Sequence, residues 1–405
     1  MPWWDPGRLL IQSMRCSCDF LSSAFSPPCP LRSHWRVVCP AVLGSPFGAT
    51  SPISTNPATG KQYGSDFPQI TPADQARVHA LLLQHVLQLP SVHAVVGASM
   101  GGMQALHFAA LFPAVAKRMV CIAATPRTSP MTVAMRHAQR TAISLDPDFQ
   151  AGRYWDTTAG GNGVGPIAGL RVARQMGMMA YRSREEFDAR FQWHVTGRPA
   201  LPHAAFEVES YLTYQGRKFA GQFDANCYML LSRCMDLMDI AQSLPRSVAR
   251  GGAEAPWTPL VGAARGAVIT ATATAASMAP SPRADAAAAL QQAYSLAGRA
   301  ARLSYEEAAT RIAADSLLVG IRQDALCPQS ELAQLAEVVS PPPHSRAAPA
   351  GRRRVRFHSL SSVYGHDSFL HDYEALGALV KGQLTRGLHA QLAAEEAHTT
   401  GLSAP

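Results

Sequence analysis

The chain has 405 residues, an apolar fraction of 47% and a formal net charge of +8. This composition is enough for a large core, so an intrinsically disordered chain is excluded, and the length suits one large or two smaller domains. Part of the positive charge lies in a run at 352–354 with Arg356, beside prolines at 341–343. We interpret the run as a solvated loop and expect no nucleic-acid partner, because no nucleic-acid motif accompanies it.

The cysteines and the apolar segments indicate the compartment. Eight cysteines are present, but none have Cys-x-x-Cys spacing and no histidine pair completes a zinc pattern, so no metal is expected. Cys39 and Cys121 lie in apolar runs, which is typical of buried free thiols in a reducing compartment. No stretch has the roughly 18 apolar residues of a membrane span. We expect a cytoplasmic protein with no membrane partner, or one in an organellar matrix if the acid-poor residues 1–34 form a transit peptide.

The first predicted elements are a buried strand at 35–40 and, after a long loop, a helix. The loop covers 41–67, is rich in Gly, Pro, Ser and Asn, and has no hydrophobic periodicity. Thr71 and Pro72 are typical of a helix start, with Thr as the N-cap and Pro in the first turn. Apolar residues at helical spacing predict the buried face of this helix: Val78, Leu81, Leu82, Val86 and Leu89.

A strand at 93–97, a helix through 104–112 and a strand at 117–124 come next. Strand, helix and strand in this order are typical of a parallel sheet with helical crossovers. The first half of the chain therefore indicates the α/β class.

The second half begins with a segment of mixed helical character and returns to the sheet only near residue 316. Strands are predicted at 316–321 and 355–360, and a closing helix at about 367–384. The six predicted parts are 1–34, an atypical N-terminal segment; 35–124, the first part of the core; 125–245, a helical lid; 246–302, a mobile Ala/Gly/Pro-rich insertion; 303–390, the second part of the core; and 391–405, a C-terminal tail.

A candidate nucleophile stands at the turn between the predicted strand 93–97 and the helix after it. Residues 97–101 read Gly-Ala-Ser-Met-Gly, which satisfies the G-x-S-x-G nucleophile elbow in its expected strand–turn–helix context. Such a turn strains its central residue and lifts the hydroxyl above the sheet edge, at the positive end of the helix. Ser99 is therefore the predicted nucleophile, and a serine placed by chance in a Gly-rich turn is the alternative.

A serine nucleophile needs a base, and the base needs an acid that orients it. Asp324 follows the strand 316–321, and His366 follows the last strand, 355–360. Each alone reads more simply as a turn residue or a surface histidine. Together they follow the chain order Ser, Asp, His of the α/β-hydrolase fold and fall on one sheet edge. The sequence thus predicts that fold: a mostly parallel sheet with helices on both faces and a helical lid insertion.

Six longer segments are far more restrictive than the elbow. They are NPATGKQYGSDFP (56–68), VGASMGGMQAL (96–106), ARQMGMMAY (173–181), VESYLTYQGRKF (208–219), FDANCY (223–228) and YGHDSFL (364–370). They resemble the homoserine O-acetyltransferases and their close relatives within the α/β-hydrolase superfamily. The resemblance runs from about Trp35 to the closing helix.

The resemblance implies a ping-pong acyl transfer that serves methionine biosynthesis. Ser99 would take an acetyl group from acetyl-CoA and pass it to the hydroxyl of homoserine. His366 would act first as base and then as acid, oriented by Asp324, and the backbone N–H of Met100 would donate to the oxyanion. No metal or bound cofactor is implied, and acetyl-CoA is a co-substrate.

The resemblance also implies substrate-binding residues and an assembly. Arg174, Tyr181 and Asp367 occupy the positions that grip the amino acid in the family, where a guanidinium can pair with the α-carboxylate and a carboxylate with the α-ammonium. An ordinary helix face is the alternative for Arg174 and Tyr181. A homodimer formed through the helical lid is a further expectation.

The sequence departs from the family at its N-terminus. Family members place further strands and a loop ahead of a Trp-Trp-Asp segment, which here occupies positions 3–5. That loop supplies the second oxyanion donor in this fold, so we expect missing N-terminal strands and a weak enzyme. Three alternatives stay open: acylation of serine or another alcohol, ester hydrolysis, and a catalytically impaired, truncated homologue that persists as a binding or dimerisation partner.

Overall fold

The computed structural model describes residues 37–161, 163–192, 206–241, 304–340 and 355–385. The predicted N-terminal segment, the Ala/Gly/Pro-rich insertion, the C-terminal tail and the basic run other than Arg356 lie outside these ranges. Of the predicted part boundaries, only the one at 124/125 falls within them, so the six-part division stays a prediction.

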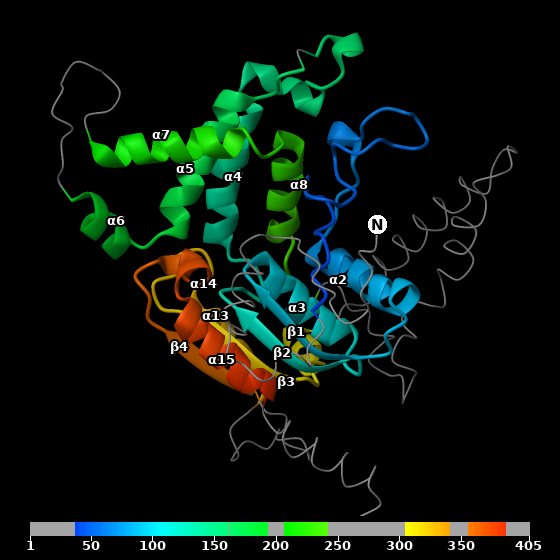
Figure 1. The fold of residues 1–405 in the computed structure, drawn as a ribbon, viewed down its shortest axis with the longest axis vertical. Coiled ribbons are helices and arrows are strands. Elements are labelled where there is room, and N and C mark those ends of the chain that lie inside the picture. The colour runs from blue at the N-terminus through cyan, green and yellow to red at the C-terminus, as the bar shows by residue number, and fades with distance from the viewer. Residues whose placement is uncertain (1–36, 162, 193–205, 242–303, 341–354, 386–405) are drawn as a thin grey trace, which may run out of the picture.

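A four-stranded parallel sheet forms the centre of the described structure (Figure 1). The strands are β1 (Val92–Ala98), β2 (Ala116–Ile122), β3 (Asp315–Ile321) and β4 (Val355–Leu360), in that order across the sheet. Ala98 pairs with Ile122 and Ile321 with Leu360, so all four strands end at one edge. Residues that follow these strands are therefore brought together although they are far apart in sequence.

Helices cover both faces of the sheet. One core contains α2 (Pro72–Leu81), α3 (Met100–Leu111) and α13 (Gln329–Val339), packed on residues such as Met119 and Leu318. The opposite core contains α15 (Tyr373–Thr385), packed on alternate residues of the same strands, including Val120 and Val319. Because strand side chains alternate between faces, continuous apolar runs in β2 and β3 serve both cores.

A group of helices between β2 and β3 stands over the carboxyl edge of the sheet (Figure 1). Its longer members are α4 (Pro130–Ser144), α5 (Ile167–Tyr181), α6 (Arg184–Phe191), α7 (Glu207–Ala220) and α8 (Ala225–Asp236). Helix α5 packs against both α4 and α7. A small core of its own, which includes Ile143, Leu170 and Ala220, stabilises this lid. No helix within the described ranges is long and apolar enough to span a membrane.

The helix at Pro72 begins as predicted, but its predicted buried face is wrong. Thr71 caps it by accepting from the N–H of Asp74, whose carboxylate accepts in return from the N–H of Thr71. Val78 and Val86 are 40% and 70% exposed, whereas the buried face carries three alanines, Ala73, Ala76 and Ala80. Small side chains let α2 approach α3 closely. A π-helical turn at Leu82–Val86 then rotates the following residues away from the face that a regular helix would give.

Two further predictions need correction. The strand predicted at 35–40 does not form over its described residues: Val37 takes part in a single β-bridge, and residues 38–40 have no regular secondary structure. The closing helix is two helices, α14 (Ser368–His371) and α15, because Asp372 between them has non-helical dihedral angles. The other predicted strands and helices in the described ranges are confirmed within a few residues.

Candidate active site

Ser99 occupies a strained turn between β1 and α3. Its φ of 52° and ψ of −122° lie in a region that residues with side chains rarely adopt. A Cβ on Gly97 would lie 2.0 Å from the carbonyl oxygen of Gly101, and one on Gly102 would lie 2.6 Å from the Cβ of Ala124. A Cβ on Gly101 would meet nothing within 4 Å. The steric need for glycine is therefore at 97 and 102, not at the second glycine of the G-x-S-x-G motif.

The structure brings Ser99, His366 and Asp324 into one chain of hydrogen bonds. The Oγ of Ser99 lies 2.7 Å from Nε2 of His366, and Nδ1 of His366 lies 2.7 Å from Oδ2 of Asp324. His366 sits in the short 3₁₀ helix Gly365–Asp367 after β4, and Asp324 follows β3. Both side chains are buried. This is the geometry in which a serine hydroxyl can pass its proton to an imidazole held by a carboxylate.

Asp324 is itself held by the backbone that follows it. Its Oδ1 accepts from the N–H groups of Leu326 and Cys327, both at 2.8 Å, so only Oδ2 faces His366. Burial by itself lowers the pKa of His366, but the carboxylate of Asp324 and its hydrogen bond raise that pKa well above its usual range. The imidazolium that forms when His366 takes a proton is therefore stabilised.

Of the residues expected to grip a substrate, Arg174 and Tyr181 lie together on α5. The centroid of the Tyr181 ring is 6.1 Å from that of His366. The guanidinium of Arg174 lies over the rings of Phe219 and Tyr181, at 4.8 and 5.4 Å from their centroids. Its Nε is buried without a hydrogen-bond partner, and no ion pair within the described ranges includes it. A guanidinium whose Nε is buried without a hydrogen-bond partner is a candidate group for pairing with a carboxylate.

Asp367 is buried and already has a partner that the sequence reasoning missed. Its Oδ2 lies 3.1 Å from Nε of Arg182. A second nitrogen of Arg182, Nη1, lies 3.4 Å from the carboxylate of Glu186. Burial raises the pKa of Asp367, while Arg182 and His366 act to lower it. Nothing in the sequence singles out Arg182 except that it follows Tyr181.

The N–H of Met100 is at the amino end of α3, directly after Ser99. The first N–H groups of a helix have no acceptor within it and carry partial positive charge, which suits a developing oxyanion. The side chain of Met100 is buried against Val42 and Leu231. No contact among the described residues identifies a second N–H donor for the oxyanion.

Cys327 is a second residue that sequence reasoning missed. Its sulfur, a carboxylate oxygen of Asp324 and a ring nitrogen of His366 lie within 4.8 Å of one another, and all three residues are buried. Burial raises the pKa of the Cys327 thiol, while its hydrogen bond to His366 acts to lower it. The sequence carries no local pattern that links Cys327 to His366, because the two residues are 39 positions apart and only the sheet topology brings them together.

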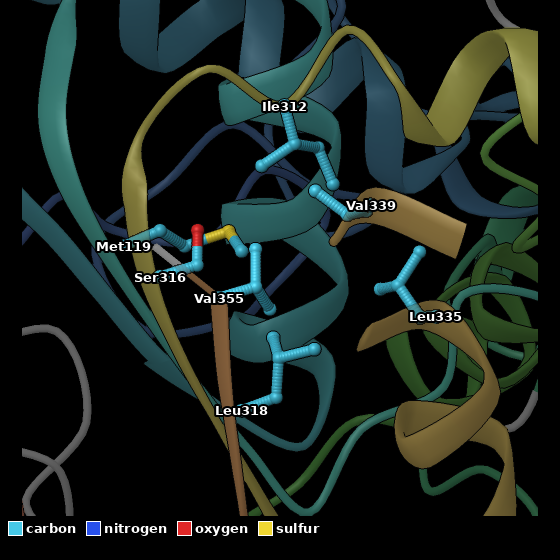
Figure 2. Close-up of a pocket in the computed structure, with 7 residues that line it drawn as sticks. All are labelled: Met119, Ile312, Ser316, Leu318, Leu335, Val339 and Val355. Carbon is cyan, nitrogen blue, oxygen red and sulfur yellow. The ribbon is translucent and has the colours of Figure 1, made fainter. Parts of the chain in front are cut away.

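A small void lies elsewhere and takes no part in this site. Figure 2 shows its lining, which includes Met119, Ser316, Val339 and Val355. Ser316 and Val355 stand at the amino ends of β3 and β4, opposite the edge that carries Ser99. Apart from Ser316 the lining residues are apolar, and the hollow has no room for a water molecule, so it is not a ligand site.

The fold and the site together define an α/β hydrolase with a Ser–His–Asp arrangement, and residues 21–173 match the model of the α/β hydrolase fold family. The chain is 32% identical over 350 residues to a homoserine O-acetyltransferase of Moorella thermoacetica. The aligned region covers 86% of this chain and 74% of that relative. It is 34% identical over 348 residues to a serine O-succinyltransferase of Litchfieldella anticariensis, with coverage of 84% and 74%. The chain belongs to the homoserine O-acetyltransferase family of acyltransferases, which confirms the resemblance drawn from its motifs.

Solved structures agree on the fold. A homoserine O-acetyltransferase from Bacillus anthracis matches with a TM-score of 0.59 and 21% identity, over 83% of this chain and 71% of that one. Esterase E22 matches with a TM-score of 0.60 and 19% identity, over 84% and 74%. One fold thus accommodates both transferases and esterases, and the distinction must come from the site.

Proposed function

We propose that this enzyme moves an acyl group from acyl-CoA to the side-chain hydroxyl of a small amino acid, through an ester on Ser99. His366 takes the proton of Ser99 as Oγ attacks the thioester carbonyl, and returns it to the departing CoA sulfur. In the second half His366 deprotonates the acceptor hydroxyl, which attacks the Ser99 ester, and then reprotonates Ser99. The observation that carries this proposal is the unbroken hydrogen-bonded chain from Ser99 to Asp324.

The acceptor is an amino acid in this proposal because a guanidinium and a carboxylate flank the triad. Among the described residues Arg174 forms no close ion pair, although its charge acts on the nearby carboxylate of Asp367, and a substrate α-carboxylate would give it a direct partner. Asp367 adjoins His366 and would hold the α-ammonium, in competition with Arg182. Water as acceptor would leave Nε of Arg174 without a hydrogen-bond partner, whereas an α-carboxylate would supply one.

Homoserine and acetyl-CoA are the leading substrates, since relatives over most of the chain bear the name homoserine O-acetyltransferase. The product, an O-acylated homoserine, would then enter methionine biosynthesis. Serine with succinyl-CoA is the second candidate, because relatives of equal similarity are named serine O-succinyltransferases.

We also propose a homodimer formed through the lid. Val172 and Met179 are exposed apolar residues seven positions apart on α5, so they share one helix face that a second lid would cover. Sedimentation of the full chain tests this: a monomer at micromolar concentration contradicts it.

The test of function separates acylation from transfer. Intact-mass measurement after mixing with acetyl-CoA or succinyl-CoA should show one acyl adduct, absent in Ser99→Ala. CoA release is then followed with homoserine, with serine and with no acceptor. Release stimulated by one amino acid supports a transferase and names its acceptor, whereas equal release without an acceptor supports an esterase. An adduct that persists in Ser99→Ala contradicts the proposed nucleophile.

A further inference from the structure

We propose that Asp324, Cys327 and His366 form a binding site for a thiophilic divalent cation such as Zn²⁺, and that an ion bound there switches the enzyme off. Within the described ranges this is the one group of three His, Cys, Asp or Glu residues whose ligand atoms cluster closely, all within 4.8 Å of one another. All three residues are buried, unlike the exposed acidic clusters that are common on protein surfaces.

The ligand types match the ion. Zn²⁺ is bound by sulfur, imidazole nitrogen and carboxylate oxygen at about 2.3, 2.0–2.1 and 2.0–2.2 Å, so tetrahedral ligands lie about 3.3–3.6 Å apart. The loosest pair in this cluster would therefore move by little more than about 1 Å. A thiolate, a carboxylate and a neutral imidazole together balance the two charges of the ion, which favours binding at a buried position.

The cluster is also held in place before any ion arrives. Cys327 and Asp324 share one turn, tied by the 2.8 Å hydrogen bond from the N–H of Cys327 to Oδ1 of Asp324. That bond leaves Oδ2 directed at His366, 2.7 Å from its Nδ1. Ser99, which contacts the other ring nitrogen, is only half-buried, so the cluster lies one residue from a partly exposed position.

Binding removes the groups that acylation requires. The Cys327 thiol releases its proton to solvent and its sulfur bonds to the metal, while a lone pair of His366 is taken up in the same way. Coordination through Nδ1 breaks the hydrogen bond to Asp324, and coordination through Nε2 removes the base that faces Ser99. Inhibition therefore follows whichever nitrogen binds, and it does not depend on which acyl group or acceptor the enzyme uses.

The experiment reads binding without activity. The full chain carries Ser99→Ala, and Cys16, Cys18 and Cys29 are changed to serine so that these thiols cannot compete for the metal. Co²⁺ is then titrated, and the thiolate-to-cobalt charge-transfer absorption in the near ultraviolet is recorded. Zn²⁺ affinity is measured by competition with a chromogenic chelator. Cys327→Ser tests the site, and Cys39→Ser, at a half-buried cysteine outside the cluster, is the matched control.

We expect one equivalent of Co²⁺ with a thiolate band, lost in Cys327→Ser and kept in Cys39→Ser, and a Zn²⁺ affinity at least tenfold weaker in Cys327→Ser. Asp324→Asn, which preserves the shape of the side chain, should weaken Zn²⁺ binding as well. It replaces Cys327→Ser as the test variant if Cys327→Ser does not fold. A missing band, a band that survives Cys327→Ser, or equal Zn²⁺ affinity in Asp324→Asn overturns the proposal. In the enzyme with Ser99 intact, Zn²⁺ should block acylation, and EDTA should restore it.

Discussion

Asp324→Asn isolates the role of one carboxylate, because the structure dictates how the amide must sit. Oδ1 accepts two backbone N–H groups at 2.8 Å, from Leu326 and Cys327. If the amide oxygen keeps these two bonds, its NH₂ group faces Nδ1 of His366. If the amide flips, two buried N–H groups lose their acceptor, at about 1–3 kcal/mol each. The unflipped orientation is therefore favoured by about 2–6 kcal/mol.

The unflipped amide gives His366 the wrong tautomer. With an NH₂ donor opposite, Nδ1 must accept, so the ring proton moves to Nε2 and points at Ser99. Nε2 then has no lone pair to take the serine proton. The equivalent carboxylate-to-amide change in a serine protease triad lowers kcat about 10⁴-fold, and we expect the rate of Ser99 acylation to fall by roughly 10³–10⁴-fold.

Rapid-quench mass spectrometry of the acyl-enzyme measures this rate directly, and a thermal melt reports folding. Asp188→Asn is the matched control, since Asp188 is an exposed carboxylate paired with Arg184 on α6, and its loss should leave the rate unchanged. If folded Asp324→Asn acylates within tenfold of the parent enzyme, Asp324 does not orient His366.

Three further predictions concern the elbow, the acceptor and the core. Gly97→Ala should prevent Ser99 acylation and lower the free energy of unfolding by about 3 kcal/mol or more, because its Cβ would clash with Gly101. Gly101→Ala, with open space around its Cβ, should keep acylation and raise the free energy of unfolding by about 0.5–1 kcal/mol in denaturant titrations. Equal effects of the two variants would refute the steric argument. Arg174→Ala should raise the acceptor KM at least tenfold while single-turnover acylation survives; an unchanged KM would remove Arg174 from the acceptor site. Burial lowers the pKa of His107 to about 3, so the unfolded chain takes the proton first and stability falls as the pH drops below about 6.5. Between pH 7 and 5 this costs about 2 kcal/mol, which His107→Leu should abolish in urea titrations; an unaltered pH dependence in that variant would contradict the assignment.

The sequence by itself determined much of the fold and the identity of the triad candidates. Continuous apolar runs predicted β2 and β3 because both faces of a parallel sheet are buried. Local chemistry predicted the N-cap at Thr71 and the strained turn at Ser99, since capping and steric clash act within a few residues. The rule that parallel strands end at one edge then placed Asp324 and His366 beside Ser99.

Only the tertiary structure decided which neighbours those residues have. The buried face of α2 depended on the alanines that meet α3, and the π-helical turn after α2 turned Val86 away from that face. Neither effect can be read from the spacing of the apolar residues. The pairing of Arg182 with Asp367 joins the end of α5 to the loop after β4, and Cys327 meets His366 across two loops. Hydrophobic periodicity reports one element at a time, whereas a contact between distant loops is fixed by how whole elements pack, so no local pattern carries it.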